Sequence, residues 1–231
     1  MELPPEAVGV TVLALHNVAV HRVLPEPAGA ALNLVTAFGL AKFAGRAGCS
    51  RADLGIHAQD VGSGLRTGLG AAAVATGAVA LGAALPATRR FFADRRVMDV
   101  GRAEAAYHVA VRIPLATALA EELLFRGVLL ALFRQRRSPA AAALWTSLLF
   151  GAWHTLPTID HYHGNPASAL VADAGRGQRL AVLATMLSTT GAGGVFAWLR
   201  LRSGSVLAPA LAHAALNASA YLAGRRLAHR W

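Results

Sequence analysis

The sequence predicts an all-α protein, a polytopic bundle of transmembrane helices with about 7–8 spans. Hydrophobic residues make up 55% of the 231 residues and charged residues only 15%, with a mean hydropathy of +0.45. Apolar stretches of about 20 residues, the length that crosses a bilayer, recur between Pro, Gly and Arg. The 23 glycines suit close contacts between membrane helices. Together these observations indicate an integral, multi-pass membrane protein.

Seven apolar windows are the candidate helices. In order they are residues 7–24, 28–44, 64–85, 104–133, 139–157, 180–201 and 204–224. The fourth window exceeds one straight crossing, so we expect a tilted helix, or a span that ends near Arg126 and is followed by a short helix. The segment 157–179 is polar and is expected to be a loop or an interfacial helix. We divide the chain into N-terminal transmembrane helices (1–100), a helical core (101–224) and a basic tail (225–231).

The positive charge of the chain is arranged as in membrane proteins. Lys and Arg number 22 against 12 Asp and Glu, a formal net charge of +10. The arginines occur in short clusters between apolar windows, such as those at 134–137 and 225–230, which is typical of loops that face anionic lipid. We therefore expect the lipid bilayer as a partner and no nucleic acid. The Arg- and Ala-rich composition favours a bacterial plasma membrane.

Two adjacent glutamates and an arginine interrupt the fourth window, in ALAEELLFRGVLLALF. An ionisable group near the middle of a membrane helix costs about 2.5–3.5 kcal/mol and is a candidate functional residue. Glu122 and Arg126 are four residues apart, the favourable spacing for an ion pair, whereas Glu121 points about 100° away. Glu122 is thus the structural partner of Arg126, and Glu121 is left for chemistry. The alternative is that all three lie at a helix end among lipid headgroups.

Two later windows also carry polar residues at a spacing of four. In LLFGAWHT, Phe150 precedes His154, and in LAPALAHAALNAS, His213 precedes Asn217. Each pair shares one helical face. His154 alone could be a hydrogen-bonded packing residue, and His213 with Asn217 could hold helices together. A carboxylate, two imidazoles and an amide are, however, also the groups that activate a water and stabilise an oxyanion.

These three motifs resemble a known family. EELLFR, FGAWH and HAALN, in this order, are similar to the EExxxR, FxxxH and HxxxN motifs of the CPBP (CAAX protease and bacteriocin-processing, Abi) family of intramembrane endopeptidases, which includes the type II CAAX prenyl endopeptidases. The resemblance covers about residues 100–220, and the first 100 residues match only as generic membrane helices. It implies that Glu121 and His154 activate the attacking water, that His213 and Asn217 stabilise the oxyanion, and that Glu122, Arg126 and Phe150 support the site.

The resemblance leads to a predicted function and leaves alternatives. We expect an intramembrane endopeptidase, without a cofactor, that hydrolyses a peptide bond in a membrane-associated or lipidated protein or peptide. In a zinc-dependent version Glu121, His154 and His213 would bind the metal, although an HExxH motif is lacking. A non-catalytic immunity or scaffold protein and a proton-coupled transporter are the other candidates. The polar residues after His154 could form a solvated loop, a lid or a metal-capturing element; they are Asp160, His161, His163 and Asn165.

Overall fold

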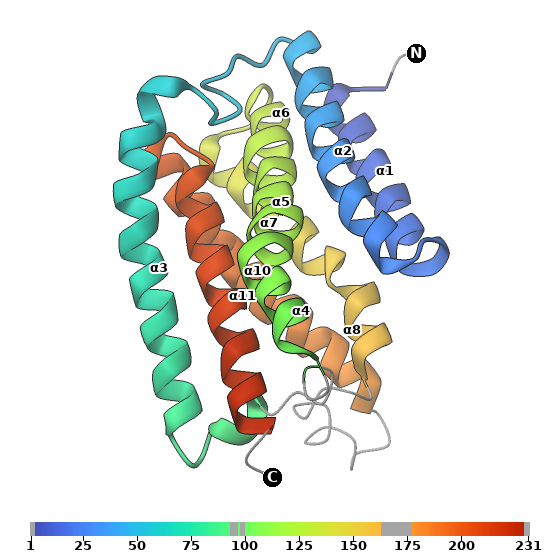
Figure 1. The fold of residues 1–231 in the computed structure, drawn as a ribbon. Coiled ribbons are helices and arrows are strands. Elements are labelled where there is room, and N and C mark those ends of the chain that lie inside the picture. Colours follow the sequence, from blue (N-terminus) through green and yellow to red (C-terminus); the bar gives the residue numbers. More distant parts are fainter. Residues whose placement is uncertain (1–2, 93–96, 98–99, 163–176, 229–231) are drawn as a thin grey trace.

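The computed structural model of the protein describes residues 3–92, 97, 100–162 and 177–228. These residues form helices joined by short connections and contain no strand (Figure 1). The predicted all-α fold is therefore confirmed. A helix begins within each of the seven predicted windows or a few residues before it.

The first half of the chain forms a hairpin and one long separate helix. The hairpin consists of α1 (Pro5–Val18), which continues as a π-helical turn η1 (Ala19–Val23), and α2 (Glu26–Arg46). A 3-10 turn, η2 (Ala58–Asp60), leads into α3 (Val61–Ala84), and a second one, η3 (Arg89–Phe92), follows it. Proline in the first turn of α1 and of α2 suits these starts, because a helix leaves its first N–H groups unbonded in any case.

The second half contains one helix that is continuous from residue 102 to 134, here called the central helix. Its consecutive segments are α4 (Arg102–Tyr107), η5 (His108–Leu119), α5 (Ala120–Glu122), η6 (Leu123–Leu129) and α6 (Leu130–Arg134). The segments η5 and η6 are π-helical, with wider turns than an α-helix. The fourth window is thus a single helix, and no separate helix begins after Arg126.

Four further helices complete the described structure. They are α7 (Pro139–Trp153), α8 (Thr155–His161), α10 (Gly177–Ser203) and α11 (Leu207–Ala228). Ser138 caps α7 by accepting a hydrogen bond from the backbone N–H of Ala141, which satisfies one of the free donors at this helix end. The first residues of the predicted basic tail, 225–228, continue α11.

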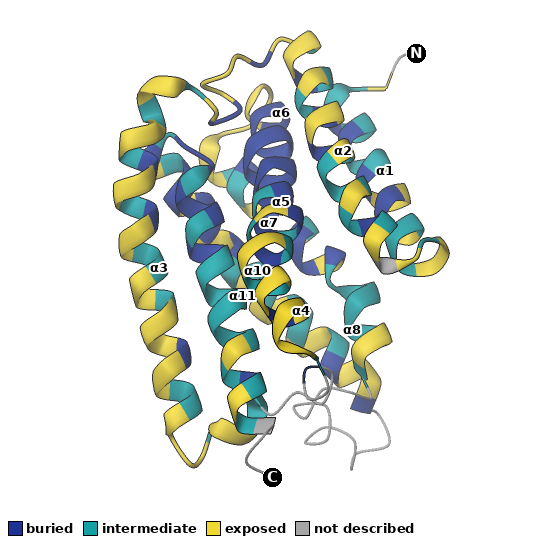
Figure 2. Ribbon diagram, in the orientation of Figure 1, coloured by how far each residue is buried: buried dark blue, intermediate teal, exposed yellow. Residues whose placement is uncertain are grey.

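The central helix lies between two groups of helices (Figure 1). The hairpin α1–α2 packs on one side of it, and α11, with α3 against its other face, packs on the opposite side. The helix α10 packs along α7 and also contacts α11. Every residue from Ala120 to Phe133 is buried, while α4 is mostly exposed (Figure 2). The charged motif EELLFR is therefore in the most enclosed part of the molecule.

Three helices of the described chain are long and apolar enough to cross a membrane. They cover Pro27–Arg46, Ala58–Ala84 and Gly177–Ser203. Large apolar side chains such as Phe38, Val74 and Leu187 are exposed on these helices, which is the pattern of a surface that faces lipid. The protein is therefore a membrane protein, and the larger count of 7–8 spans stays a prediction.

Candidate active site

The two adjacent glutamates of the central helix have different environments. Glu122 is fully buried, and its Oε1 lies 3.1 Å from Nη1 of Arg126, as expected from their spacing of four residues. The Glu121 side chain instead lines a cavity, and its Oε2 has no hydrogen-bond partner among the described residues. One carboxylate is thus paired within the helix packing, and the other is largely buried but lines the cavity.

His213 approaches the Glu122–Arg126 pair from α11. Its Nδ1 lies 2.9 Å from Oε1 of Glu122, and its ring stacks on Phe196 with centroids 5.0 Å apart. The ring is 4% exposed and is not among the residues that line the cavity. His213, Glu122 and Arg126 therefore form one buried cluster, here called the closed triad.

Aromatic rings surround the arginine of the closed triad. The Cζ atom of Arg126 lies 4.1 Å from the ring centroid of Phe150, 5.3 Å from that of Phe196 and 5.8 Å from that of Phe125. The negative face of an aromatic ring attracts a guanidinium, most strongly where water is excluded. Phe150 also meets the rings of His154 and His213 edge-on, so it connects the triad with the cavity.

His154 lies where α7 ends and α8 begins. The helix α7 stops at Trp153, and the Nδ1 atom of His154 is 2.7 Å from the backbone carbonyl oxygen of Phe150. A carbonyl only accepts hydrogen bonds, so in the neutral ring Nδ1 carries the proton and Nε2 is an acceptor. This contact leaves Nε2 available as a base.

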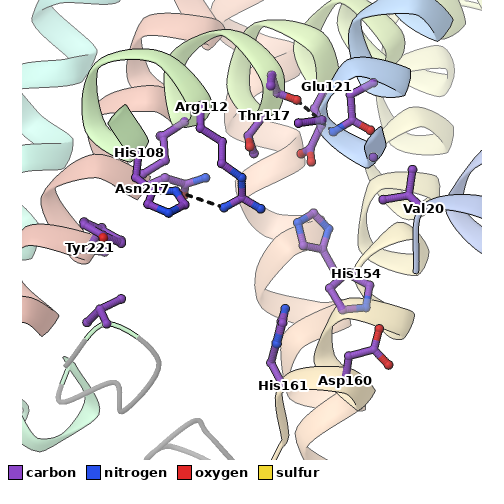
Figure 3. A pocket seen from close by; sticks show the side chains of 18 of the residues that line it. Val20, His108, Arg112, Thr117, Glu121, His154, Asp160, His161, Asn217 and Tyr221 are labelled. Carbon is purple, nitrogen blue, oxygen red and sulfur yellow. Dashed lines mark hydrogen bonds between the residues drawn. The ribbon is translucent and has the colours of Figure 1, made fainter. Parts of the chain in front are cut away.

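Three of the predicted site residues meet at one cavity of about 830 Å³ (Figure 3). Glu121 comes from the central helix, His154 from the α7–α8 junction and Asn217 from α11. His213 lies one turn before Asn217 on the same face of α11, deeper in the packing against Glu122. Glu121, His154 and Asn217 therefore line the same cavity. His213 does not line it and is buried behind the residues that do.

The polar residues after His154 divide into two groups. Asp160 and His161 belong to α8 and line the cavity, whereas His163 and Asn165 lie outside the described residues. Asp160 accepts a hydrogen bond of 2.6 Å from Nη1 of Arg22 in the hairpin. Asp160 therefore ties α8 to the hairpin at the edge of the cavity.

The cavity also has polar residues that the sequence pattern did not single out. His108, Arg112 and Thr117 line it from the central helix, and Nη1 of Arg112 lies 3.4 Å from Nδ1 of His108 (Figure 3). In an α-helix, Arg112 and Glu121 would be about two and a half turns apart, on opposite faces. The wider turns of η5 bring both to the cavity side.

Pro114 gives a physical reason for these wider turns. It lies inside η5, lacks an N–H and its ring cannot fit against the carbonyl of the preceding α-helical turn. A π-helical stretch is one of the known ways in which a helix accommodates such a defect. The signal that could have found His108 and Arg112 is their spacing of four within an apolar window, together with this proline.

The described residues do not provide an evident metal site. No group of three or more His, Cys, Asp and Glu side chains among them is arranged to hold a metal ion. Of the three proposed zinc ligands, His213 bonds Glu122 behind the cavity wall, whereas Glu121 and His154 line the cavity. The predicted zinc set therefore does not converge on one point.

The arrangement defines a class of protein: a membrane-embedded, all-helical protein with a carboxylate, an imidazole and an amide at one internal cavity. A family model described as type II CAAX prenyl endopeptidase Rce1-like matches residues 104–219, half of the chain. The chain belongs to this family of membrane proteases. Neither the curated proteins nor the solved structures yielded a match. The predicted family is confirmed, and the matched segment contains every predicted site residue.

Proposed function

We propose that the protein is an intramembrane endopeptidase that cleaves a membrane-associated or lipidated peptide with a water activated by Glu121 and His154. The observation that supports this proposal is that the Glu121 carboxylate and the His154 imidazole line one cavity. Oε2 of Glu121 is buried without a hydrogen-bond partner among the described residues, and Nδ1 of His154 is engaged so that Nε2 accepts. A water between them could lose a proton to either group.

The proposed chemistry follows from these roles. Glu121 takes a proton from the water as its oxygen attacks the carbonyl carbon of the scissile bond. The amide of Asn217 donates a hydrogen bond to the oxygen that becomes negative. When the tetrahedral intermediate collapses, the C–N bond breaks and Glu121 returns its proton to the leaving amine. The oxyanion role that the family resemblance implies for His213 stays a prediction, and we propose that His213 also holds Glu122.

The cavity lining combines polar and apolar residues, which suits a peptide. Its apolar lining residues include Val20, Leu24, Ile113, Ala116 and Trp153. Such a surface suits an extended peptide with small or apolar side chains, delivered from the bilayer. A prenyl or acyl chain on the substrate would remain in the lipid beside the exposed apolar helices.

The test is cleavage of a peptide library by the purified protein in lipid nanodiscs, with each peptide in a prenylated, an acylated and an unmodified form. The change of Glu121→Gln should lower kcat by about 10²–10⁴-fold because it removes the general base, and His154→Ala should act in the same direction. Thermal unfolding should match the wild type. A folded Glu121→Gln variant that cleaves as fast as the wild type would mean that Glu121 is not the base.

A separate part of this experiment tests the zinc-dependent alternative. The protein is purified in the presence of a chelator, and its zinc content and activity are measured together. Metal-free protein with full activity is the expected result. Activity that disappears with the metal and returns with zinc would support the alternative ligand set. If no peptide is cleaved in any form, the scaffold interpretation becomes the better one.

A further inference from the structure

We infer that the hairpin α1–α2, which lies outside the segment that the family model matches, positions the catalytic groups through a partly buried polar strap. The strap consists of His16 and Asn17 on α1 and of Asn33 and Thr36 on α2. This inference rests on the proposed function, because it concerns the same two groups, Glu121 and His154. It assigns a role in the reaction to helices that resemble family members only as generic membrane spans.

One end of the strap holds the residue next to His154. The amide nitrogen Nδ2 of Asn17 donates a buried hydrogen bond of 2.8 Å to the backbone carbonyl of Trp153. The last carbonyls of a helix have no partner within the helix, so this amide serves as a side-chain cap for α7. The ring of His16 stacks on the Trp153 indole, with centroids 5.5 Å apart and planes 11° apart. The junction that carries His154 is thus held from α1 in two ways.

The other end of the strap reaches the helix that carries Glu121. Nδ2 of Asn33 donates a hydrogen bond of 2.9 Å to the carbonyl of Ala116. Ala116 belongs to the π-helical segment η5, five residues before Glu121, which is about one turn of such a helix. Because η5 determines which way Glu121 faces, a bond to this turn helps to fix the carboxylate.

The donor and acceptor of each hydrogen bond between the two ends of the strap can be assigned without conflict. Since Nδ2 of Asn33 donates to a carbonyl, its Oδ1 accepts, and it lies 2.8 Å from Nε2 of His16. Neutral His16 therefore carries its proton on Nε2, and its Nδ1 accepts from the Thr36 hydroxyl at 2.9 Å. Each ring nitrogen and the Asn33 amide is satisfied, which favours one geometry of these side chains, whereas Oδ1 of Asn17 has no hydrogen-bond partner among the described residues.

The position of the strap distinguishes it from ordinary polar contacts between membrane helices. Its two ends bind the residue before His154 and the turn before Glu121, which lie on separate helices of the cavity. His16 and Asn17 do not line the cavity, so they act through Trp153 and do not touch a bound peptide. They are positioning residues, and a displacement of a catalytic group by about 1 Å can cost about 100-fold in rate.

The test uses two changes in α1 that remove bonds and keep volume. His16→Phe retains a ring against Trp153 and loses both hydrogen bonds, and Asn17→Leu removes the cap of α7. Each should lower kcat by about 10–100-fold with KM within about twofold of the wild type. Thr36→Val should have a smaller effect in the same direction, and Thr36→Ser should restore the wild-type rate. Thr189→Val is the matched control, because among the described residues the hydroxyl of Thr189 bonds only carbonyls of its own helix.

A double-mutant comparison separates positioning from folding. In a His154→Ala background, Asn17→Leu should cause no further loss, because the group that it positions is absent. A loss of active protein through misfolding would instead appear in both backgrounds. Equal losses with and without His154 would overturn the inference while leaving Glu121-dependent cleavage, and so the proposed function, intact.

A measurement without substrate tests the structural part of the inference separately from cleavage. Hydrogen–deuterium exchange of the peptide over residues 150–158 should become at least about tenfold faster in Asn17→Leu and remain unchanged in Thr189→Val. Unchanged exchange in Asn17→Leu would contradict the strap even if no substrate is ever cleaved. Faster exchange together with an inactive wild type would support the strap and reject the proposed protease.

Discussion

The charged residues of EELLFR lie in two different environments, one closed and one at the cavity. On the closed side, Glu122, Arg126 and His213 share hydrogen bonds and have almost no exposed surface. On the cavity side, Glu121 lines the cavity together with His154 and further polar residues (Figure 3). A charge that is paired and enclosed contributes to the architecture, and a charge beside open space is available for reaction. Neighbouring glutamates of the same helix thus have different roles.

The largest expected effect comes from breaking the closed side. Arg126→Met removes the cation and leaves the buried Glu122 carboxylate with only His213, which should lower the free energy of unfolding by about 3–5 kcal/mol. Unfolding in mixed detergent micelles measures this loss. The further change of Glu122→Leu in the same protein should recover most of it, because no isolated charge then remains.

This rescue tests whether the triad is structural. If the double variant with Glu122→Leu and Arg126→Met is as unstable as Arg126→Met alone, the Glu122–Arg126 ion pair stabilises the fold by more than the neutralisation of its two charges. If the double variant is stable and still cleaves with a wild-type kcat, the closed side contributes nothing to the chemistry beyond packing.

A smaller effect is expected on the cavity side at Asn217. Asn217→Ala should lower kcat by about 10²–10³-fold, because it removes one donor to the oxyanion, and should leave thermal unfolding nearly unchanged. Single-turnover kinetics measure the chemical step. Ser219→Ala is the control on the same helix, since its hydroxyl bonds the carbonyl of Ala215, and it should cleave like the wild type. Similar losses in both variants would point to a general disturbance of α11.

The smallest effect concerns the space around Arg126. A Cβ at Gly193 would lie 3.0 Å from Nη2 of Arg126 and 3.1 Å from the backbone Cα of Ser147. Gly193→Ala should therefore destabilise the protein by about 1–3 kcal/mol through overpacking. At Gly194 a Cβ would meet nothing within 4 Å, so Gly194→Ala should be neutral or stabilising by about 0.5–1 kcal/mol. Equal effects at the two glycines would show that both Arg126 and the backbone at Ser147 can shift without cost.

The sequence by itself determined the helical class and the parts of the site. Composition and apolar windows gave the all-α membrane fold, because the bilayer imposes its length and polarity on every span. The order and spacing of EELLFR, FGAWH and HAALN indicated the family, and the four-residue spacing of Glu122 and Arg126 indicated their ion pair. These are local features, which a regular helix converts directly into a shared face.

Only the tertiary structure decided which groups meet across helices. The contact of His213 with Glu122 joins residues 91 positions apart, and the strap joins α1 to Trp153, 136 positions away. The π-helical turns around Pro114 rotate His108 and Arg112 to the side of Glu121, against the regular period of 3.6 residues. Spacing along the chain specifies a face only while the helix stays regular, and it cannot specify which other helix that face will meet.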